Sequence, residues 1–114
     1  MKHLTLESKD LLIGDEAADV LTEYAALIAR RGLGDRVELR AIGSDGDEVV
    51  ATIVLSAGTT LVTETSRNQL PEPDNSEAVA YMQNQIRRIT SPPPIRPAET
   101  ETETDVWESR FDEL

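Results

Sequence analysis

The sequence predicts an α+β fold, in which two helices pack on one face of a small antiparallel sheet and an acidic tail follows. Residues 36–65 are rich in Val, Ile and Thr and are interrupted by turn-forming residues at 43–47 and 57–58, which is typical of short strands folded back on one another. Stretches with helical periodicity flank this region on both sides. With a short hairpin before the first helix, the predicted order is β-β-α-β-β-β-α.

The hairpin and the first helix occupy the first third of the chain. Residues 3–6 and 11–13 are predicted to form two short strands around the polar bend 7–10. Residues 16–31 are predicted to form a helix, with acidic residues at its start, basic residues at its end and Gly32 as a left-handed cap. Its apolar residues recur at helical spacing and define the expected buried stripe: Ala17, Val20, Leu21, Tyr24, Leu27 and Ile28.

The three strands that follow are expected to form an antiparallel meander. In the first strand, Val37, Leu39 and Ala41 alternate with polar residues, as in a strand with one buried face. The second strand, residues 48–56, is apolar on both sides, which predicts a central position or cover on both faces. The third strand, residues 59–65, is expected to return beside the second.

A second helix is predicted over residues 75–89. Asp74 and Glu77 have the spacing of a capping box at its start, and three consecutive prolines from Pro92 prevent its continuation. Its apolar stripe consists of Val79, Met82, Ile86 and Ile89.

Two stretches carry a resemblance. LPEPDNSEAVAYM (residues 70–82) and AIGSDGDEV (residues 41–49) resemble segments of small uncharacterised proteins of high-G+C Gram-positive bacteria. The resemblance spans most of the first 90 residues and implies no function, cofactor or site. The excess of arginine over lysine and the frequent alanines agree with such a genome, so the expected location is the bacterial cytoplasm.

Composition divides the chain into three parts. Residues 1–90 form the expected domain, residues 91–97 (SPPPIRP) a stiff proline-rich linker, and residues 98–114 an acidic tail. The domain carries 15 acidic and 9 basic residues, whereas residues 91–114 carry 7 and 2. The formal net charge of −11 argues against binding to a nucleic-acid backbone, and no apolar run is long enough to cross a membrane.

The residue inventory offers no catalytic constellation. His3 is the single histidine and cysteine is absent, which argues against zinc sites and most nucleophilic triads. Asp45, Asp47 and Glu48 do not have the spacing of a calcium loop and are interpreted as a solvated turn. We therefore expect a protein that is not an enzyme and has no cofactor or metal.

Two arginine pairs stand out among the few basic residues. Residues 30–31 and 87–88 each fall in the last turn of a predicted helix, where they complement the helix dipole. An anion-binding corner shared by the two pairs is the alternative interpretation.

The tail contains the most specific functional signal. Trp107 and Phe111 are the only Trp and Phe of the protein, and on a helix they share one face with Leu114. Large aromatic residues are rare in unfolded acidic segments, so we expect this face to bind another surface. The predicted partner-binding residues are Val106, Trp107, Arg110, Phe111 and Leu114.

Three functional hypotheses follow from this segment. The first is a non-enzymatic adaptor or regulator whose tail binds a protein partner with a hydrophobic, basic-rimmed groove. The second is a structural or homodimeric domain whose tail packs on itself or on a sister subunit. The third is a small-ligand binder or enzyme with a carboxylate site that the sequence does not locate.

Overall fold

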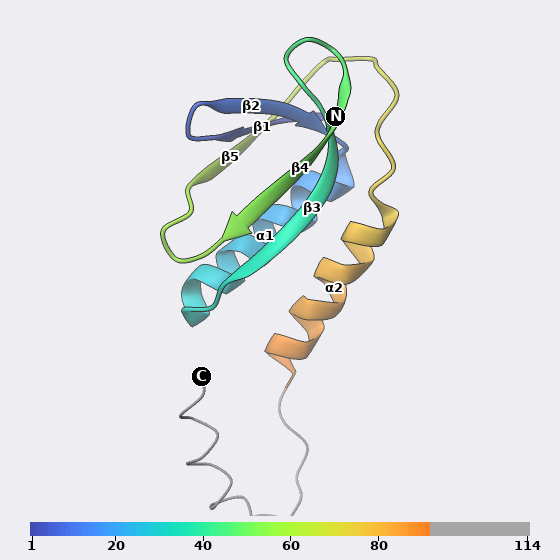
Figure 1. The fold of residues 1–114 in the computed structure, drawn as a ribbon. Helices are drawn as coiled ribbons and strands as arrows, with labels where there is room; N and C mark the ends of the chain where they lie inside the picture. Colours follow the sequence, from blue (N-terminus) through green and yellow to red (C-terminus); the bar gives the residue numbers. More distant parts are fainter. Residues whose placement is uncertain (92–114) are drawn as a thin grey trace, which may run out of the picture.

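The computed structural model describes residues 1–91, which form an α+β fold with a five-stranded antiparallel sheet and two helices (Figure 1). The order of strands and helices is the predicted one. The elements are β1 (Lys2–Leu6), β2 (Lys9–Ile13), α1 (Asp15–Arg31), β3 (Asp35–Ile42), β4 (Glu48–Leu55), β5 (Leu61–Thr65) and α2 (Ser76–Thr90).

Helix α1 confirms its predicted signals and starts one residue earlier than expected. Gly32 adopts φ 65° and ψ 31°, the left-handed conformation that ends the helix, and Leu33 N–H donates to Ile28 C=O at 3.0 Å. Its apolar residues face the sheet because they recur at helical spacing. Every residue of the predicted stripe is buried: Ala17, Val20, Leu21, Tyr24, Leu27 and Ile28.

The long hairpin of β3 and β4 also forms as predicted. Its turn is closed by Gly43 N–H, which donates to Asp47 C=O at 2.8 Å, and Gly46 supplies the positive φ of 90° that the turn requires. The strands then pair over their whole length, from Ile42↔Glu48 to Asp35↔Leu55.

The predicted meander is wrong at its third strand. The sheet order is β4-β3-β2-β1-β5, so β5 pairs with β1 and not with β4. Thr59 turns the chain away from β4, because its hydroxyl accepts a hydrogen bond from Ser56 N–H and donates one to Val54 C=O, both at 3.0 Å. The vacant edge of β1 then accepts β5 over five residue pairs.

This topology makes β4 an edge strand, so its predicted central position is also wrong. Val50 and Val54 are 60% and 65% exposed, which shows that the second apolar side of the strand is not covered within the described residues. Their hydrophobicity is therefore not explained by the core of this domain.

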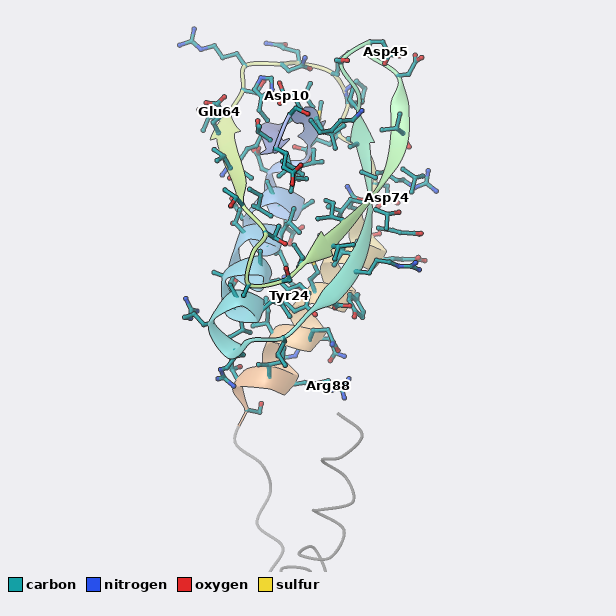
Figure 2. The ribbon with its side chains drawn as sticks, turned by 60° about the vertical axis from the view of Figure 1, so that its left-hand side comes forward. Asp10, Tyr24, Asp45, Glu64, Asp74 and Arg88 are labelled. Atoms are coloured by element: carbon teal, nitrogen blue, oxygen red, sulfur yellow. The ribbon has the colours of Figure 1, made fainter. Side chains whose placement is uncertain are left out.

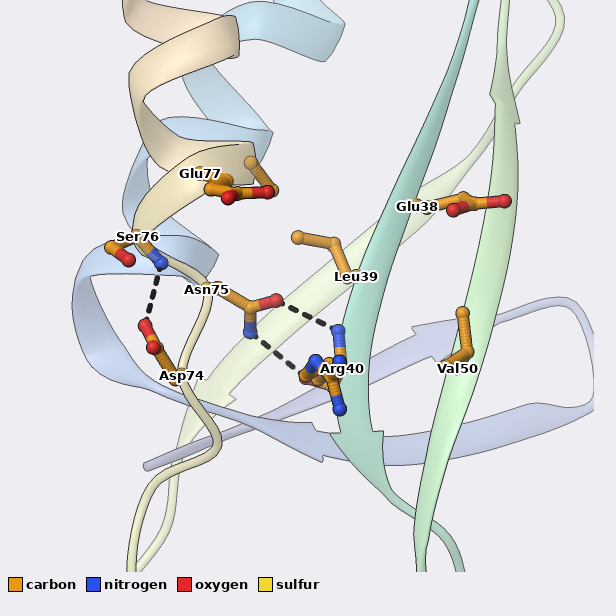
Figure 3. Close-up of a pocket in the computed structure, with 9 residues that line it drawn as sticks. Glu38, Leu39, Arg40, Val50, Asp74, Asn75, Ser76 and Glu77 are labelled. Carbon is orange, nitrogen blue, oxygen red and sulfur yellow. Dashed lines mark hydrogen bonds between the residues drawn. The ribbon is translucent and has the colours of Figure 1, made fainter.

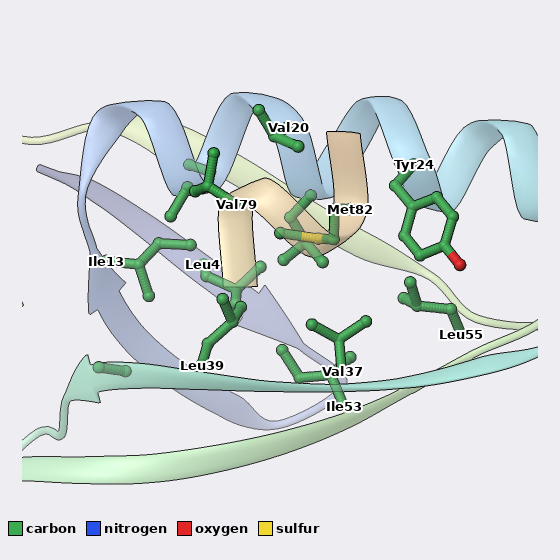
Figure 4. Close-up of a cluster of buried hydrophobic side chains, with 14 of the residues drawn as sticks. Leu4, Ile13, Val20, Tyr24, Val37, Leu39, Ile53, Leu55, Val79 and Met82 are labelled. Carbon is green, nitrogen blue, oxygen red and sulfur yellow. The ribbon is translucent and has the colours of Figure 1, made fainter. Parts of the chain in front are cut away.

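The core lies between the sheet and the two helices. Side chains of α1 and α2 meet those of the strands in one continuous cluster (Figure 4). No charged residue is buried in the described part of the chain. The largest fully buried side chains are Tyr24, Leu4, Ile13, Leu21, Ile28, Leu39, Leu55 and Met82.

Helix α2 completes β3 where a neighbouring strand is missing. Strand β2 pairs with β3 only at Leu12↔Ile42, which leaves the rest of that edge of β3 without a strand partner. Asn75 fills the gap: its Oδ1 accepts from Arg40 N–H at 2.7 Å and its Nδ2 donates to Arg40 C=O at 2.9 Å (Figure 3). One side-chain amide thus replaces the main chain of a strand.

The start of α2 differs slightly from the prediction. Asn75 is the N-cap residue but makes no side-chain capping bond, because its amide is engaged with β3. Asp74 supplies the local acceptor, with Oδ1 receiving Ser76 N–H at 3.0 Å. Asp74 therefore acts at the helix start, as expected, although through an Asx turn and not through a capping box with Glu77.

Substitution of Asn75 by Ala is expected to lower the free energy of unfolding by roughly 1–3 kcal/mol, because both Arg40 main-chain groups lose their partner. Urea denaturation followed by circular dichroism measures this change. The matched control is Asn84→Ala, because Asn84 is an exposed residue of α2 whose side chain makes no hydrogen bond in the described structure. Equal stability of the two variants would contradict the role of Asn75.

Candidate functional site

The predicted partner-binding residues lie outside residues 1–91. Nothing in the described structure bears on that set, and its role stays a prediction: Val106, Trp107, Arg110, Phe111 and Leu114. The described domain presents a different candidate, the free edge of β4, which the sequence analysis had placed in the interior of the sheet.

The hydrogen-bonding groups of β4 alternate between β3 and the outside. Since Gly43 bonds Asp47 and the register is regular, odd-numbered residues of β4 bond β3 and even-numbered residues turn their N–H and C=O groups outward. The C=O of Val54 is already bonded by Thr59. Val50 and Thr52 have no strand neighbour on this side within residues 1–91, and this is the stretch we call the β4 edge.

The outer face next to the β4 edge is apolar along the edge strand and charged beside it. Val50 and Val54 lie opposite Arg40 and Arg36 of β3, and Thr52 lies opposite Glu38. A valine, a threonine and a valine on one side of an edge strand form a short apolar strip that a neighbouring strand would cover.

A hollow of about 520 Å³ opens on the inner side of the β4 edge. It lies between β4 and the β1–β2 hairpin, and Val50 and Thr52 contribute to its rim, so the hollow is reached directly from the edge. Apart from Lys9, the side chains that β1, β2 and the inner side of β4 contribute to it are apolar: Leu6, Leu11, Val49, Ala51 and Ile53.

Acidic residues surround this end of the domain. Asp10, Asp45 and Glu64 lie at one end of the molecule and Arg88 at the other (Figure 2). In the β3–β4 turn, Asp45 Oδ1 accepts Asp47 N–H at 3.1 Å, which is the geometry of a turn. Within the described residues, no group of three or more acids and histidines is placed to hold a metal ion.

A second cluster joins Tyr24 of α1, Asp35 of β3 and Tyr81 of α2. Both tyrosine hydroxyls donate to Asp35 Oδ2, that of Tyr81 at 2.6 Å, and Arg36 N–H donates to Oδ1 at 2.7 Å. The two rings meet edge to face with centroids 6.5 Å apart. This cluster was not predicted from the sequence; the signal for it is that Tyr24 lies in the predicted buried stripe, where a tyrosine hydroxyl requires a hydrogen-bond partner.

The electrostatics of this cluster indicate a structural role. Burial by itself raises the pKa of Asp35, but the hydrogen bonds from Tyr24, Tyr81 and Arg36 N–H outweigh it and hold the pKa below its usual value. Burial, together with the bond to Asp35, raises the pKa of Tyr24 far above its usual value. An ionised carboxylate that accepts three donors ties both helices to β3.

A polar groove runs between β3 and the start of α2 (Figure 3). It encloses about 330 Å³ and is lined by Glu38, Arg40, Asp74 and Glu77, with Asn75 spanning it to reach β3. Its charges are mixed and solvent-exposed, so it offers neither an apolar surface nor a concentrated charge to a ligand.

Comparison with protein-family models, with curated proteins and with solved structures found no match. The resemblance to small proteins of high-G+C Gram-positive bacteria therefore stays a prediction from residues 41–49 and 70–82. Of the two helices in residues 1–91, neither is long and apolar enough to cross a membrane.

Substitution of Asp35 by Asn is expected to lower the free energy of unfolding by roughly 1–2 kcal/mol at neutral pH, since an uncharged amide accepts hydrogen bonds less strongly. The folded pKa of Asp35 lies below its unfolded value, so its contribution is present above about pH 4 and is lost as the pH falls through the folded pKa. The stability difference between the wild type and the variant should therefore shrink in acid.

Urea unfolding followed by circular dichroism at neutral pH and near pH 3 measures this difference. Asp47→Asn, in the exposed β3–β4 turn, removes the same charge from a carboxylate that accepts no hydrogen bond in the described structure. A difference for Asp35→Asn that stays constant across this pH range, or that Asp47→Asn reproduces, would contradict the assignment.

Proposed function

We propose that this chain is a non-enzymatic adaptor of the bacterial cytoplasm that binds one protein through the β4 edge and another through the C-terminal segment 106–114. The observation that carries the proposal is the β4 edge itself, where outward-facing main-chain groups, exposed valines and an apolar hollow coincide. An adaptor requires two separate binding surfaces, and these two belong to different parts of the chain.

The geometry of the β4 edge suits the addition of a strand. An extended peptide that paired with Val50 and Thr52 would alternate its side chains between the two faces of the sheet. One set would lie beside the exposed Val50 and Val54, and the other would enter the hollow next to Leu6 and Leu11. In this mode of recognition the main chain supplies affinity and the side-chain positions supply specificity.

The C-terminal segment supplies the second surface in this proposal. Trp107 and Phe111 are the residue types that most often dominate the energy of protein interfaces, and with Leu114 they share one face of a helix. Because the segment is acidic, its partner is expected to have a hydrophobic groove with a basic rim.

A homodimer is the second candidate, and the symmetry of the β4 edge favours it. If two copies paired antiparallel about Thr52, Val50 of each copy would lie opposite Val54 of the other, on the same face. The bond from Thr59 to Val54 C=O removes one acceptor from this arrangement. For this reason we place a heterologous peptide first.

The adaptor model predicts that substitutions in one surface abolish binding of one partner and leave binding of the other unchanged. Val50→Lys/Val54→Lys should release the partner of the β4 edge, because lysines on an edge strand oppose strand addition. Trp107→Ala/Phe111→Ala should release the partner of the segment and weaken its affinity by about 30-fold or more. Affinity capture with each variant, followed by titration of the captured proteins by calorimetry, tests both statements.

The control Val62→Lys/Leu70→Lys adds the same charge at two exposed apolar positions, 55% and 45% exposed, away from the β4 edge. It should keep every partner. The adaptor model is wrong if one double substitution releases all partners together, or if the control releases the same proteins as Val50→Lys/Val54→Lys. A β4-edge variant that changes only the oligomeric mass would identify the homodimer instead.

A further inference from the structure

The C-terminal ends of the two helices form a basic corner. Arg30 and Arg31 end α1, Arg87 and Arg88 end α2, and all four side chains are exposed. The helix ends lie next to each other, since Arg31 Nη1 donates to Ile89 C=O at 3.3 Å. Four of the nine basic residues of the domain thus gather at one end of the molecule. We call these four residues the arginine corner.

The arginine corner has no acidic counterpart in the described structure. Within residues 1–91, none of its four side chains lies in a salt bridge, and Arg88 bonds only the neutral Gln85, at 3.1 Å. Asp35 is committed to Tyr24, Tyr81 and Arg36 N–H. The helix dipoles favour cations at these helix ends, but like charges on adjacent ends repel each other unless an anion lies between them.

We propose that the arginine corner binds the acidic stretch 98–105 (AETETETD) of the same chain. The stretch carries four acids, and it begins seven residues after Ser91, the last residue that the structure describes. Seven extended residues span about 23 Å, which is enough to return across two adjacent helix ends. The arginine corner and the acidic stretch that complements it therefore belong to the same chain and are joined by a short linker.

Attachment decides whether such a contact forms. An exposed ion pair adds little by itself, so the same stretch offered as a free peptide would bind the corner weakly. A short tether raises the effective concentration to the millimolar range, where several weak pairs suffice. The opposite end of the domain attracts the acidic stretch less, because the acids Asp10, Asp45 and Glu64 lie there (Figure 2).

This docking goes beyond the adaptor function and does not depend on it. It engages residues 98–105 and leaves Trp107 and Phe111 to any other surface. The substitutions that test the β4 edge and those that test the arginine corner change different residues, so the two proposals are tested separately.

These 114 residues contain no cysteine, which permits a single nitroxide label by Thr102→Cys. Docking predicts paramagnetic broadening of the amides of Gly32 and Leu33, which belong to the end of α1 and not to the helix that precedes the tail. Arg30→Gln/Arg87→Gln should reduce this broadening about two- to fivefold, because it removes two of the four charges that attract the acidic stretch. These two arginines are chosen because their side chains make no hydrogen bond in the described structure, so their loss should not disturb the fold.

Two further variants complete the experiment. Glu101→Gln/Glu103→Gln leaves the domain intact and should give a similar reduction, whereas Lys9→Gln/Arg67→Gln removes two exposed cations elsewhere and should change nothing. Unbroadened Gly32 and Leu33 amides would overturn the proposal. Broadening that survives both the arginine and the glutamate substitutions, or that disappears on dilution, would overturn it equally.

Discussion

The sheet order of this domain depends on one pairing, that of β5 with β1. When the chain leaves β4, the hydroxyl of Thr59 bonds Val54 C=O and Ser56 N–H and directs the chain toward the far edge of the hairpin. Had β5 stayed beside β4, the exposed valines of β4 would have been covered on one side. The β4 edge is therefore a consequence of topology, and the apolar hollow next to it lies between β4 and the β1–β2 hairpin.

The same topology leaves β3 incomplete, and α2 compensates. Because β2 meets β3 at one residue pair only, an asparagine at the start of α2 bonds the main chain of Arg40, and farther along Asp35 joins the hydroxyls of Tyr24 and Tyr81. These two polar contacts hold α2 against β3 at both ends of a mostly apolar interface. Charged residues also differ between the two ends of the domain, with Asp10, Asp45 and Glu64 at one end and Arg88 at the other (Figure 2).

Local patterns predicted the elements well, because helix periodicity, the glycine cap and the Asp-Gly turn act within a few residues of each other. Gly32, the stripe of α1 and the β3–β4 turn were all confirmed. The position of β4 was wrong for a physical reason. Val50 and Val54 look like core residues in a sequence, since hydrophobicity alone does not distinguish a buried face from one kept for a partner.

The long-range contacts of single side chains could not be predicted from the sequence. Asn75 and Arg40 are 35 residues apart, and Asp35 and Tyr81 are 46 apart, so no spacing pattern connects them. The β4 edge could not be predicted for the same reason, because an edge strand is recognised only when the order of the strands in the sheet is known. The partner-binding residues predicted in the tail came from composition and helical spacing, and they lie outside the described residues, so they stay a prediction: Val106, Trp107, Arg110, Phe111 and Leu114.

Residue-resolved hydrogen exchange in a dilute solution of the isolated chain tests most directly whether the β4 edge is free. The account predicts fast exchange for the outward-facing amides of Val50 and Thr52, and exchange slower by about 100-fold or more for Ala51 and Ile53, which bond β3. If Val50 and Thr52 exchange as slowly as their neighbours, the edge is already covered and the account is contradicted.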